Sequence, residues 1–331
     1  MQSSAKSSGG INAAAPQGAA VFLRLQNSVY PDKQINMTVI QTLNAAGRPL
    51  VSVEFFPPKT GAAQNTFNKG AGELTGLNPD FVSVTCGAGG SATGATLEIS
   101  KQLRDLGYSA VMPHCTCVGV SRQELARSTD EIIAQGFQNI MALRGDPPRG
   151  EKFFKPAAGG FRYAAELVAF LRERHPQLCI GVAGYPEKHP EASGLEQDIR
   201  HLKEKVGAGA DFITTQLFLH NHVYFEFVEK CRAAGITVPI MPGLLPVISL
   251  EQITRMRGFC EFHVPDELLR DLEAAQNDPV RMERIGLYWA IEQIAELIEG
   301  GAPGIHLYLL NRAKTAFYPE LFACLSRVRG R

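Results

Sequence analysis

Residues 50–59, Leu-Val-Ser-Val-Glu-Phe-Phe-Pro-Pro-Lys, form a short apolar run that ends at a charged residue and a proline turn. Seven further runs of this kind follow along the chain. Because such continuous runs leave no face for water, each is expected to be a strand covered on both sides, as in a parallel sheet. The eight runs cover residues 50–55, 80–86, 110–115, 139–143, 179–183, 212–217, 238–241 and 305–309.

Longer stretches with helical periodicity separate most of these runs. Apolar residues recur in them at i, i+3, i+4 and i+7, the spacing of one face of an amphipathic helix. Clear examples are 92–106, 121–136, 161–175 and 193–206. Eight strands alternating with helices in one domain of about 280 residues predict the α/β class and a (β/α)₈ TIM barrel, not an open doubly wound sheet. We expect the helical stretch 265–300 to be an insertion before the last strand.

The N-terminal residues differ in composition from the rest of the chain. The first 20 are small, polar and almost uncharged, so they offer little bulk to bury. We therefore predict a disordered or loosely attached tail over residues 1–35 and a single domain over residues 36–331.

Charge and cysteine content exclude several classes of protein. The 33 Lys and Arg residues balance the 33 Asp and Glu residues, which argues against a nucleic-acid backbone as the main partner. No uninterrupted apolar stretch approaches the length of a membrane-spanning helix. The seven cysteines are an odd number and several lie inside apolar runs. We expect reduced, buried thiols and a cytoplasmic location.

Polar or turn-forming residues recur where the apolar runs end. In a barrel of this kind, the chemistry lies at the C-terminal ends of the strands. Chance would scatter such residues along the runs, so a single functional face is the simplest explanation. The residues are Glu54, Thr85, His114, Arg144, Gly145, Asp146, Tyr185, His189, Gln216, Pro242, Gly243, Tyr308, Asn311 and Arg312.

Two carboxylates among them are candidate catalytic residues. Desolvation at the end of a buried strand should disfavour the ionised form of Glu54 and raise its pKa, which suits a general acid. The alternative is a carboxylate that caps a loop or pairs with Lys59. Asp146 lies in the loop Arg-Gly-Asp-Pro-Pro. It either tunes a bound cofactor or simply pairs with Arg144.

Two further patterns are typical of a metal site and of a dinucleotide-binding site, but each is incomplete. His114 precedes Cys115 and Cys117, yet side chains alternate along a strand and no second pair has ligand spacing, so we predict no metal site. Residues 87–92, Gly-Ala-Gly-Gly-Ser-Ala, fit a dinucleotide-binding fingerprint. That fingerprint also needs an acidic residue at the end of the next strand, where His114 stands instead.

One helical stretch carries a polar constellation. Asp198, His201 and Lys205 are spaced i, i+3 and i+7 and so share one helix face. An acid and two potential cations there suit the ribose hydroxyls and phosphate of a nucleotide. The alternative is an ordinary solvated helix face.

Eight motifs, in order along the chain, resemble the methylenetetrahydrofolate reductase family. They cover the chain from about residue 36 to the end, and the length is similar to that of the bacterial form, a catalytic barrel alone. The motifs are residues 52–59 (SVEFFPPK), 81–85 (FVSVT), 112–114 (MPH), 143–148 (LRGDPP), 185–192 (YPEKHPEA), 214–218 (TTQLF), 241–247 (MPGLLPV) and 306–313 (HLYLLNRA).

The resemblance implies both cofactor and reaction. It implies a barrel that binds FAD non-covalently and reduces 5,10-methylenetetrahydrofolate to 5-methyltetrahydrofolate with NADH or NADPH. The two substrates would use one site in turn by ping-pong kinetics, feeding one-carbon metabolism and methionine synthesis. Glu54 matches the general acid that helps to open the imidazolidine ring. Asp146 matches the aspartate that tunes the flavin and favours a cationic folate intermediate. The implied partners are these small molecules, and the family forms homo-oligomers.

Other positions match the binding contacts of the family. The implied FAD contacts are Thr85, His114, Arg144, Gly145, Asp146, Tyr163, Ala164, Tyr185, His189, Asp198, His201 and Lys205. The implied substrate contacts are Gln216, Gln252, Met256, Tyr308 and Arg312. Met256 stands where the family has a phenylalanine. His201 and Glu204 stand where bacterial enzymes carry Asn and Arg, so Glu204 removes a positive charge near the pyrophosphate.

Two alternatives remain open beside this reading. The first is a nicotinamide dehydrogenase that uses residues 87–92 and binds no flavin. The second is a flavin-binding subunit that needs another protein to reduce folate.

Overall fold

The computed structural model describes residues 37–86, 93–147, 154–258, 260–311 and 319–330. They belong to the unit Ile35–Arg331, and the tail predicted over residues 1–35 lies outside the described residues. The strands are β1 (Leu50–Phe55), β2 (Phe81–Val84), β3 (Val111–Thr116), β4 (Asn139–Leu143), β5 (Cys179–Gly184), β6 (Phe212–Thr215), β7 (Ile240–Met241), β8 (Gly243–Leu244) and β9 (Gly304–Leu307). The helices are α2 (Val39–Ala45), α3 (Gly61–Leu74), the 3₁₀ turn η2 (Thr75–Leu77), α4 (Thr93–Asp105), α5 (Arg122–Ala134), α6 (Ala164–Arg174), α7 (Leu195–Gly207), α8 (Asn221–Ala233), α9 (Leu250–Met256), α10 (Asp266–Ala274), α11 (Pro279–Glu299) and α13 (Pro319–Gly330).

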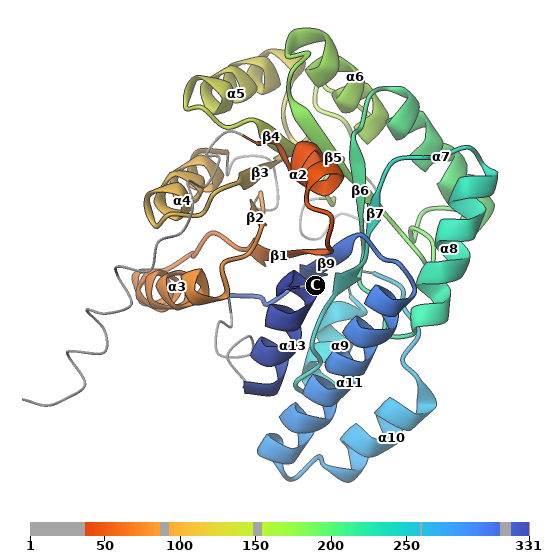
Figure 1. Ribbon diagram of the computed structural model, residues 1–331. Coiled ribbons are helices and arrows are strands. Elements are labelled where there is room, and N and C mark those ends of the chain that lie inside the picture. Colours follow the sequence, from red (N-terminus) through yellow and green to blue (C-terminus); the bar gives the residue numbers. More distant parts are fainter. Residues whose placement is uncertain (1–36, 87–92, 148–153, 259, 312–318, 331) are drawn as a thin grey trace, which may run out of the picture. The chain divides into compact units, whose positions relative to one another are not determined.

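The strands form a parallel barrel surrounded by helices (Figure 1). In the described residues the strand order is β7-β6-β5-β4-β3-β2-β1-β9-β8. β7 pairs with β6 and β8 pairs with β9, so the short segment that contains both strands joins the two edges of the sheet. The predicted TIM barrel is confirmed. Of the seventh predicted run, 238–241, only Ile240–Met241 forms a strand, and β8 follows after Pro242, which has no N–H to donate to a neighbouring strand.

Three strands end sooner than their apolar runs predict. β2, β6 and β9 stop at Val84, Thr215 and Leu307. The apolar residues Leu217 and Leu309 beyond two of these ends are still buried, which is why the runs look longer than the strands. Thr85, Gln216 and Tyr308 therefore lie in the first loop residues above the barrel, at the end where the predicted site should lie.

The alternation of side chains divides the barrel into an outer shell and an interior. Val51, Val53 and Phe55 of β1 join the apolar cluster that packs under the helices. Leu50 joins a separate cluster with Phe81, Met112, Phe212 and Val39, the last from α2. Since successive side chains point to opposite faces, Ser52 and Glu54 share the inward side with Leu50. The interior thus has an apolar floor below a polar layer.

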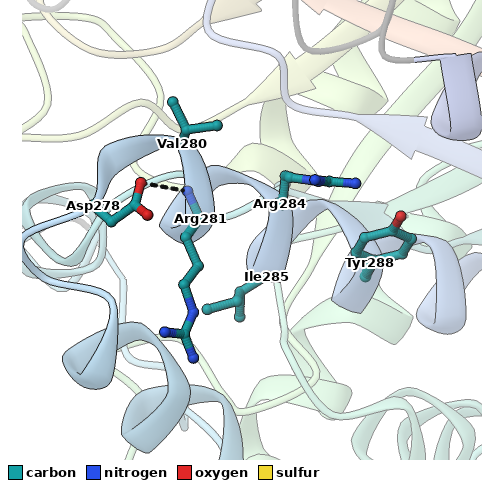
Figure 2. A pocket seen from close by; sticks show the side chains of 6 residues that line it. All are labelled: Asp278, Val280, Arg281, Arg284, Ile285 and Tyr288. Atoms are coloured by element: carbon teal, nitrogen blue, oxygen red, sulfur yellow. Dashed lines mark hydrogen bonds between the residues drawn. The ribbon is translucent and has the colours of Figure 1, made fainter.

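The helical stretch before the last strand is only partly an insertion. α11 packs against α8 and α13, so it belongs to the helix ring, and α9 and α10 are the additional helices. α11 begins where Asp278 accepts a hydrogen bond from the Arg281 amide (3.0 Å) and Pro279 occupies the first turn. An open hollow of about 380 Å³ at this end of the helix contains none of the predicted site residues (Figure 2).

Two expectations about composition can be compared with the structure. All seven cysteines are thiols, and all except the partly exposed Cys86 are buried, as predicted. Among the described helices, none combines the length and the apolar character needed to cross a bilayer.

Candidate active site

Glu54 lies in a buried polar layer inside the barrel. Its Oε2 is 3.4 Å from His114 Nε2 and 3.7 Å from His306 Nε2, and Ser83 Oγ donates to the same oxygen at 3.4 Å. These residues come from β1, β2, β3 and β9, each from the inward side of its strand. The alternative pairing of Glu54 with Lys59 is replaced by contacts with two histidines.

A second contact extends this layer away from the carboxylate. Ser52 Oγ lies 2.8 Å from His306 Nδ1 and 3.3 Å from the Ile305 carbonyl oxygen. If the hydroxyl donates to the carbonyl, Nδ1 must carry a proton and Nε2 faces Glu54. Glu54, His306 and Ser52 thus form one connected chain of polar contacts.

The pKa of Glu54 is the balance of opposing effects. Burial is the largest and raises the pKa, as expected, but the interaction with His306, the nearby His114 and the Ser83 hydroxyl lower it. The net direction is downward, so the expectation of a raised pKa is wrong for this structure. The error arises because the histidines are invisible to reasoning about β1 alone. Burial lowers the pKa of His114 despite the attraction of Glu54, which favours its neutral form.

Tyr308 closes one side of the site. Its hydroxyl donates to the Thr215 carbonyl oxygen at 2.7 Å, and its ring meets His306 edge-on, with centroids 5.0 Å apart. Gly243 lies beneath the ring, where an added Cβ would be 2.6 Å from Tyr308 Cε2 and 2.3 Å from the Thr215 carbonyl oxygen. Only glycine allows this close approach.

In the loop after β4, Arg144 does not form the ion pair with Asp146 that was considered from the sequence. Arg144 makes a two-pronged ion pair with Glu191, at 2.6 and 2.8 Å, in place of the alternative pairing with Asp146. Gly145 has a φ of +85°, and an added Cβ there would be 2.6 Å from Val118 Cγ1. This turn leaves Asp146 exposed and available to a ligand.

The loop after β5 is tied to helix α7. The His189 amide donates to Asp198 Oδ2 at 2.9 Å, and the His189 ring meets the Tyr185 ring edge-on at 4.8 Å. Burial raises the pKa of Tyr185, and burial followed by Arg144 lowers the pKa of His189. A neutral phenol and a neutral imidazole therefore stand beside a carboxylate that is already fixed in place.

Lys205 fits an anionic ligand. Its Nζ donates to the Ala183 carbonyl oxygen at 2.6 Å. Burial lowers its pKa to about 8, although Asp198 partly opposes this shift. A neighbouring phosphate would offset the cost of keeping this ammonium charged. Asp198 and Lys205 thus face the loop after β5, whereas His201 is exposed and lies 3.2 Å from Glu204.

His201 and Tyr163 lie together at the outer side of the site. Their rings are nearly parallel, with centroids 6.4 Å apart, and Tyr163 is the N-cap of α6, directly before Ala164. Both residues are predicted cofactor contacts. Thr85 lies at the inner side, where its amide donates to the Phe55 carbonyl oxygen at 2.9 Å.

The predicted substrate contacts share an apolar support. Met256 and Tyr308 pack against one cluster that includes Leu217 and Leu245. Gln252 is buried and its side-chain oxygen accepts from the Ile248 amide at 2.8 Å. Gln216 Oε1 accepts from the adjacent Leu217 amide, also at 2.8 Å. Arg312 and the glycine loop 87–92 lie outside the described residues.

Sequence reasoning missed four residues of this site: Ser52, Ser83, Thr215 and His306. Each lies on a strand within or next to a recognised motif, and a period of two counted back from Glu54 would have found Ser52. In the described part of the chain, no three His, Cys, Asp or Glu side chains are grouped so as to hold a metal ion.

The region that contains these residues is similar to known proteins. A family model described as methylenetetrahydrofolate reductase matches residues 39–318. The chain belongs to the methylenetetrahydrofolate reductase family. It is 38% identical over 288 residues to methylenetetrahydrofolate reductase (NADH) 1 of Arabidopsis thaliana, covering 84% of this chain and 48% of that protein. It is 35% identical over 271 residues to 5,10-methylenetetrahydrofolate reductase of Escherichia coli, covering 82% of this chain and 89% of that protein.

Members of the reductase family thus differ in how much of their length this chain spans. It covers about half of the plant relatives, 48% in Arabidopsis, and most of the bacterial ones. A solved structure is also similar, with a TM-score of 0.60 and 16% identity, covering 88% of this chain and 98% of that one. It is an uncharacterised Clostridium thermocellum protein that binds two copies of 5-methyl-5,6,7,8-tetrahydrofolic acid. At this identity the likeness concerns the fold alone.

Proposed function

We propose that this protein reduces 5,10-methylenetetrahydrofolate to 5-methyltetrahydrofolate with NADH or NADPH, through bound FAD. Family membership supports the reaction, and relatives named as NADH enzymes support the donor. The observation that carries the proposal is the buried group of Glu54, His114 and His306 inside the barrel. It supplies an acid at the strand ends, next to residues that suit a nucleotide.

The residues present fit FAD. Lys205 and Arg144 provide positive charge for its pyrophosphate, and Asp198 provides an acceptor for hydroxyl groups. The Gly145 turn needs glycine, because its φ is +85° and an added Cβ would be 2.6 Å from Val118 Cγ1 and 3.2 Å from Thr116 Cβ. When bound, FAD supplies the redox chemistry, taking a hydride equivalent from NAD(P)H and returning one to the folate in a separate half-reaction.

Glu54 and His306 supply the proton. Ring opening of the folate needs a proton on the ring nitrogen that leaves the methylene carbon, and a cationic iminium remains on the other nitrogen. We assign that proton to the Glu54–His306 pair, with Ser52 fixing the orientation of the imidazole. After the transfer the pair has lost one positive charge, which favours the cationic product beside it.

Asp146 is assigned a charge role. It is exposed in a loop at the strand ends, so its carboxylate is free to face the cationic folate. Gln216, Gln252, Met256 and Tyr308 would form the wall against which the folate and the nicotinamide bind in turn. We also propose a cytoplasmic homo-oligomer that acts on small molecules and supplies methyl groups for methionine synthesis. The thiol state of the seven cysteines supports the compartment.

An anaerobic visible spectrum tests this function directly. The purified protein, with FAD added if needed, is titrated first with NADH and then with methylenetetrahydrofolate. A flavin band that bleaches with NADH and returns with the folate is the expected result. Absence of a flavin band would favour a nicotinamide dehydrogenase. Bleaching without recovery would retain a flavin enzyme and remove the folate, and a bound flavin that NADH does not bleach would favour a partner-dependent subunit.

A further inference from the structure

The loop after β5 touches a segment 76 residues further along the chain. Glu187 Oε2 accepts a hydrogen bond from the His263 amide at 2.8 Å. Next to it, Lys188 Nζ lies 2.7 Å from Glu261 Oε2. Lys188 has a φ of +70°, so the backbone turns sharply where these two side chains leave it. The two contacts join the loop that holds Tyr185 and His189 to the segment that follows α9.

That segment supports the substrate side of the site. Cys260, Phe262 and Val264 are buried in the apolar cluster against which Met256 and Tyr308 pack. Alternate residues point outward, and the Cys260 amide donates to the Met256 carbonyl oxygen at 3.1 Å. The position of residues 260–264 therefore helps to fix where the Met256 side chain stands.

The two contacts differ in strength. The Lys188–Glu261 pair is exposed, with 30% and 58% of the side chains accessible, and such surface pairs contribute little. The Glu187 carboxylate is half-buried, and its Oε1 is buried without a hydrogen-bond partner among the described residues. Burying a carboxylate costs free energy, and here it provides one charged acceptor for a backbone N–H. The contact that matters is the one between Glu187 and His263.

We propose that Glu187 is a positioning residue that holds residues 260–264 against the cofactor loop and thereby sets the affinity for both substrates. The inference rests on the proposed function, because it assigns Met256 and Tyr308 to the shared substrate wall. Glu187 takes no part in proton transfer or in FAD binding in this assignment. Its loss should therefore raise KM for NADH and for the folate together and leave kcat and bound FAD nearly unchanged.

Three variants separate this role from a general loss of structure. Glu187→Ala removes the acceptor, and Glu187→Gln keeps an acceptor oxygen without the charge. Glu124→Ala is the matched control, since Glu124 also accepts a backbone N–H, from Ser121 at 2.7 Å, but at the exposed start of α5. Loss of a charged hydrogen bond corresponds to a change of about tenfold or more. We expect Glu187→Ala to raise both KM values about tenfold, with Glu187→Gln intermediate and Glu124→Ala unchanged.

Hydrogen–deuterium exchange gives a readout that does not depend on activity. The His263 amide should exchange about tenfold faster or more in Glu187→Ala than in the wild type, and unchanged in Glu124→Ala. An unchanged His263 amide, or a fall in kcat with unaltered KM values, would overturn the proposal. If the wild type itself fails the flavin titration, the proposed function falls, while the exchange experiment still decides whether Glu187 holds the segment.

Discussion

If FAD binds as proposed, Lys205 should make its affinity depend on pH. Its partly buried ammonium has a pKa lowered to about 8 by desolvation, so between pH 7 and pH 9 the charged fraction in the free protein falls about tenfold, from roughly 0.9 to roughly 0.1. A bound pyrophosphate should restore the pKa, because an opposite charge favours the ammonium. FAD should therefore bind about tenfold more weakly at pH 9 than at pH 7, a difference of about 1.4 kcal/mol.

Neither Arg144 nor His189 changes its charge between pH 7 and pH 9, so the pH dependence is assigned to Lys205. Burial opposes the charge of Arg144, but its hydrogen bonds to Glu191 prevail and raise its pKa, so Arg144 stays cationic throughout. Burial lowers the pKa of His189, and His189 is neutral by pH 7. The steep loss of affinity should be absent in Lys205→Met and present in Lys203→Met, a variant of an exposed lysine on the same helix.

The measurement is the quenching of FAD fluorescence on titration with flavin-free protein, at several pH values and constant ionic strength. Constant ionic strength is needed because salt screens charge interactions near the surface. Equal pH slopes in wild type and Lys205→Met would refute the assignment of Lys205 to the pyrophosphate. A wild-type affinity that does not change between pH 7 and pH 9 would refute it equally.

Three other changes have defined outcomes. Glu54→Gln should slow the folate half-reaction by about 10²–10⁴-fold and leave flavin reduction by NADH nearly intact in anaerobic stopped-flow traces; equal losses would contradict its role as the acid. Gly243→Ala should lower the free energy of unfolding by about 2–4 kcal/mol in urea, through overpacking and loss of the Tyr308 hydrogen bond, whereas Gly207→Ala, which adds a methyl in open space, should be nearly neutral. Asp80→Asn should cost about 3 kcal/mol, since this buried carboxylate pairs with two arginines, and an unchanged urea midpoint would count against that ion pair.

The barrel itself was predictable because its signal is local. Each strand is a continuous apolar run, and several site residues, such as Glu54 and Arg144, lie at or just after the end of such a run. Strand ends were less predictable, since Leu217 and Leu309 remain buried after the hydrogen-bonded ladder has stopped. Along most of a strand, residues are both buried and hydrogen-bonded to a neighbouring strand. At the end of a strand, residues stay buried after this hydrogen bonding has stopped. Hydrophobicity therefore places Gln216 and Tyr308 inside strands when they lie in the loops above them.

Partners across the barrel were not predictable from one sequence. Arg144 pairs with Glu191, 47 residues away, although Asp146 is only two residues distant. His306 meets Ser52 across 254 residues, because barrel closure makes the last strand a neighbour of the first. Sequence spacing predicts that a charged residue pairs with the nearest opposite charge in the chain. In the folded protein, it pairs with the opposite charge that the loops bring close to it.

The corrected direction of the Glu54 pKa changes how the acid should be understood. A lone buried carboxyl would hold its proton because burial disfavours the charge, but here His306 and His114 compensate for that burial. In the proposed mechanism the proton donor is therefore Glu54 together with the histidines that contact it. A neutral substrate that excludes water would strengthen the attraction between Glu54 and His306, whereas a developing cation would draw the remaining negative charge towards itself. Under the proposed function, Ser52 and His306 thus belong to the proton-donating group, which reasoning from Glu54 alone does not reveal.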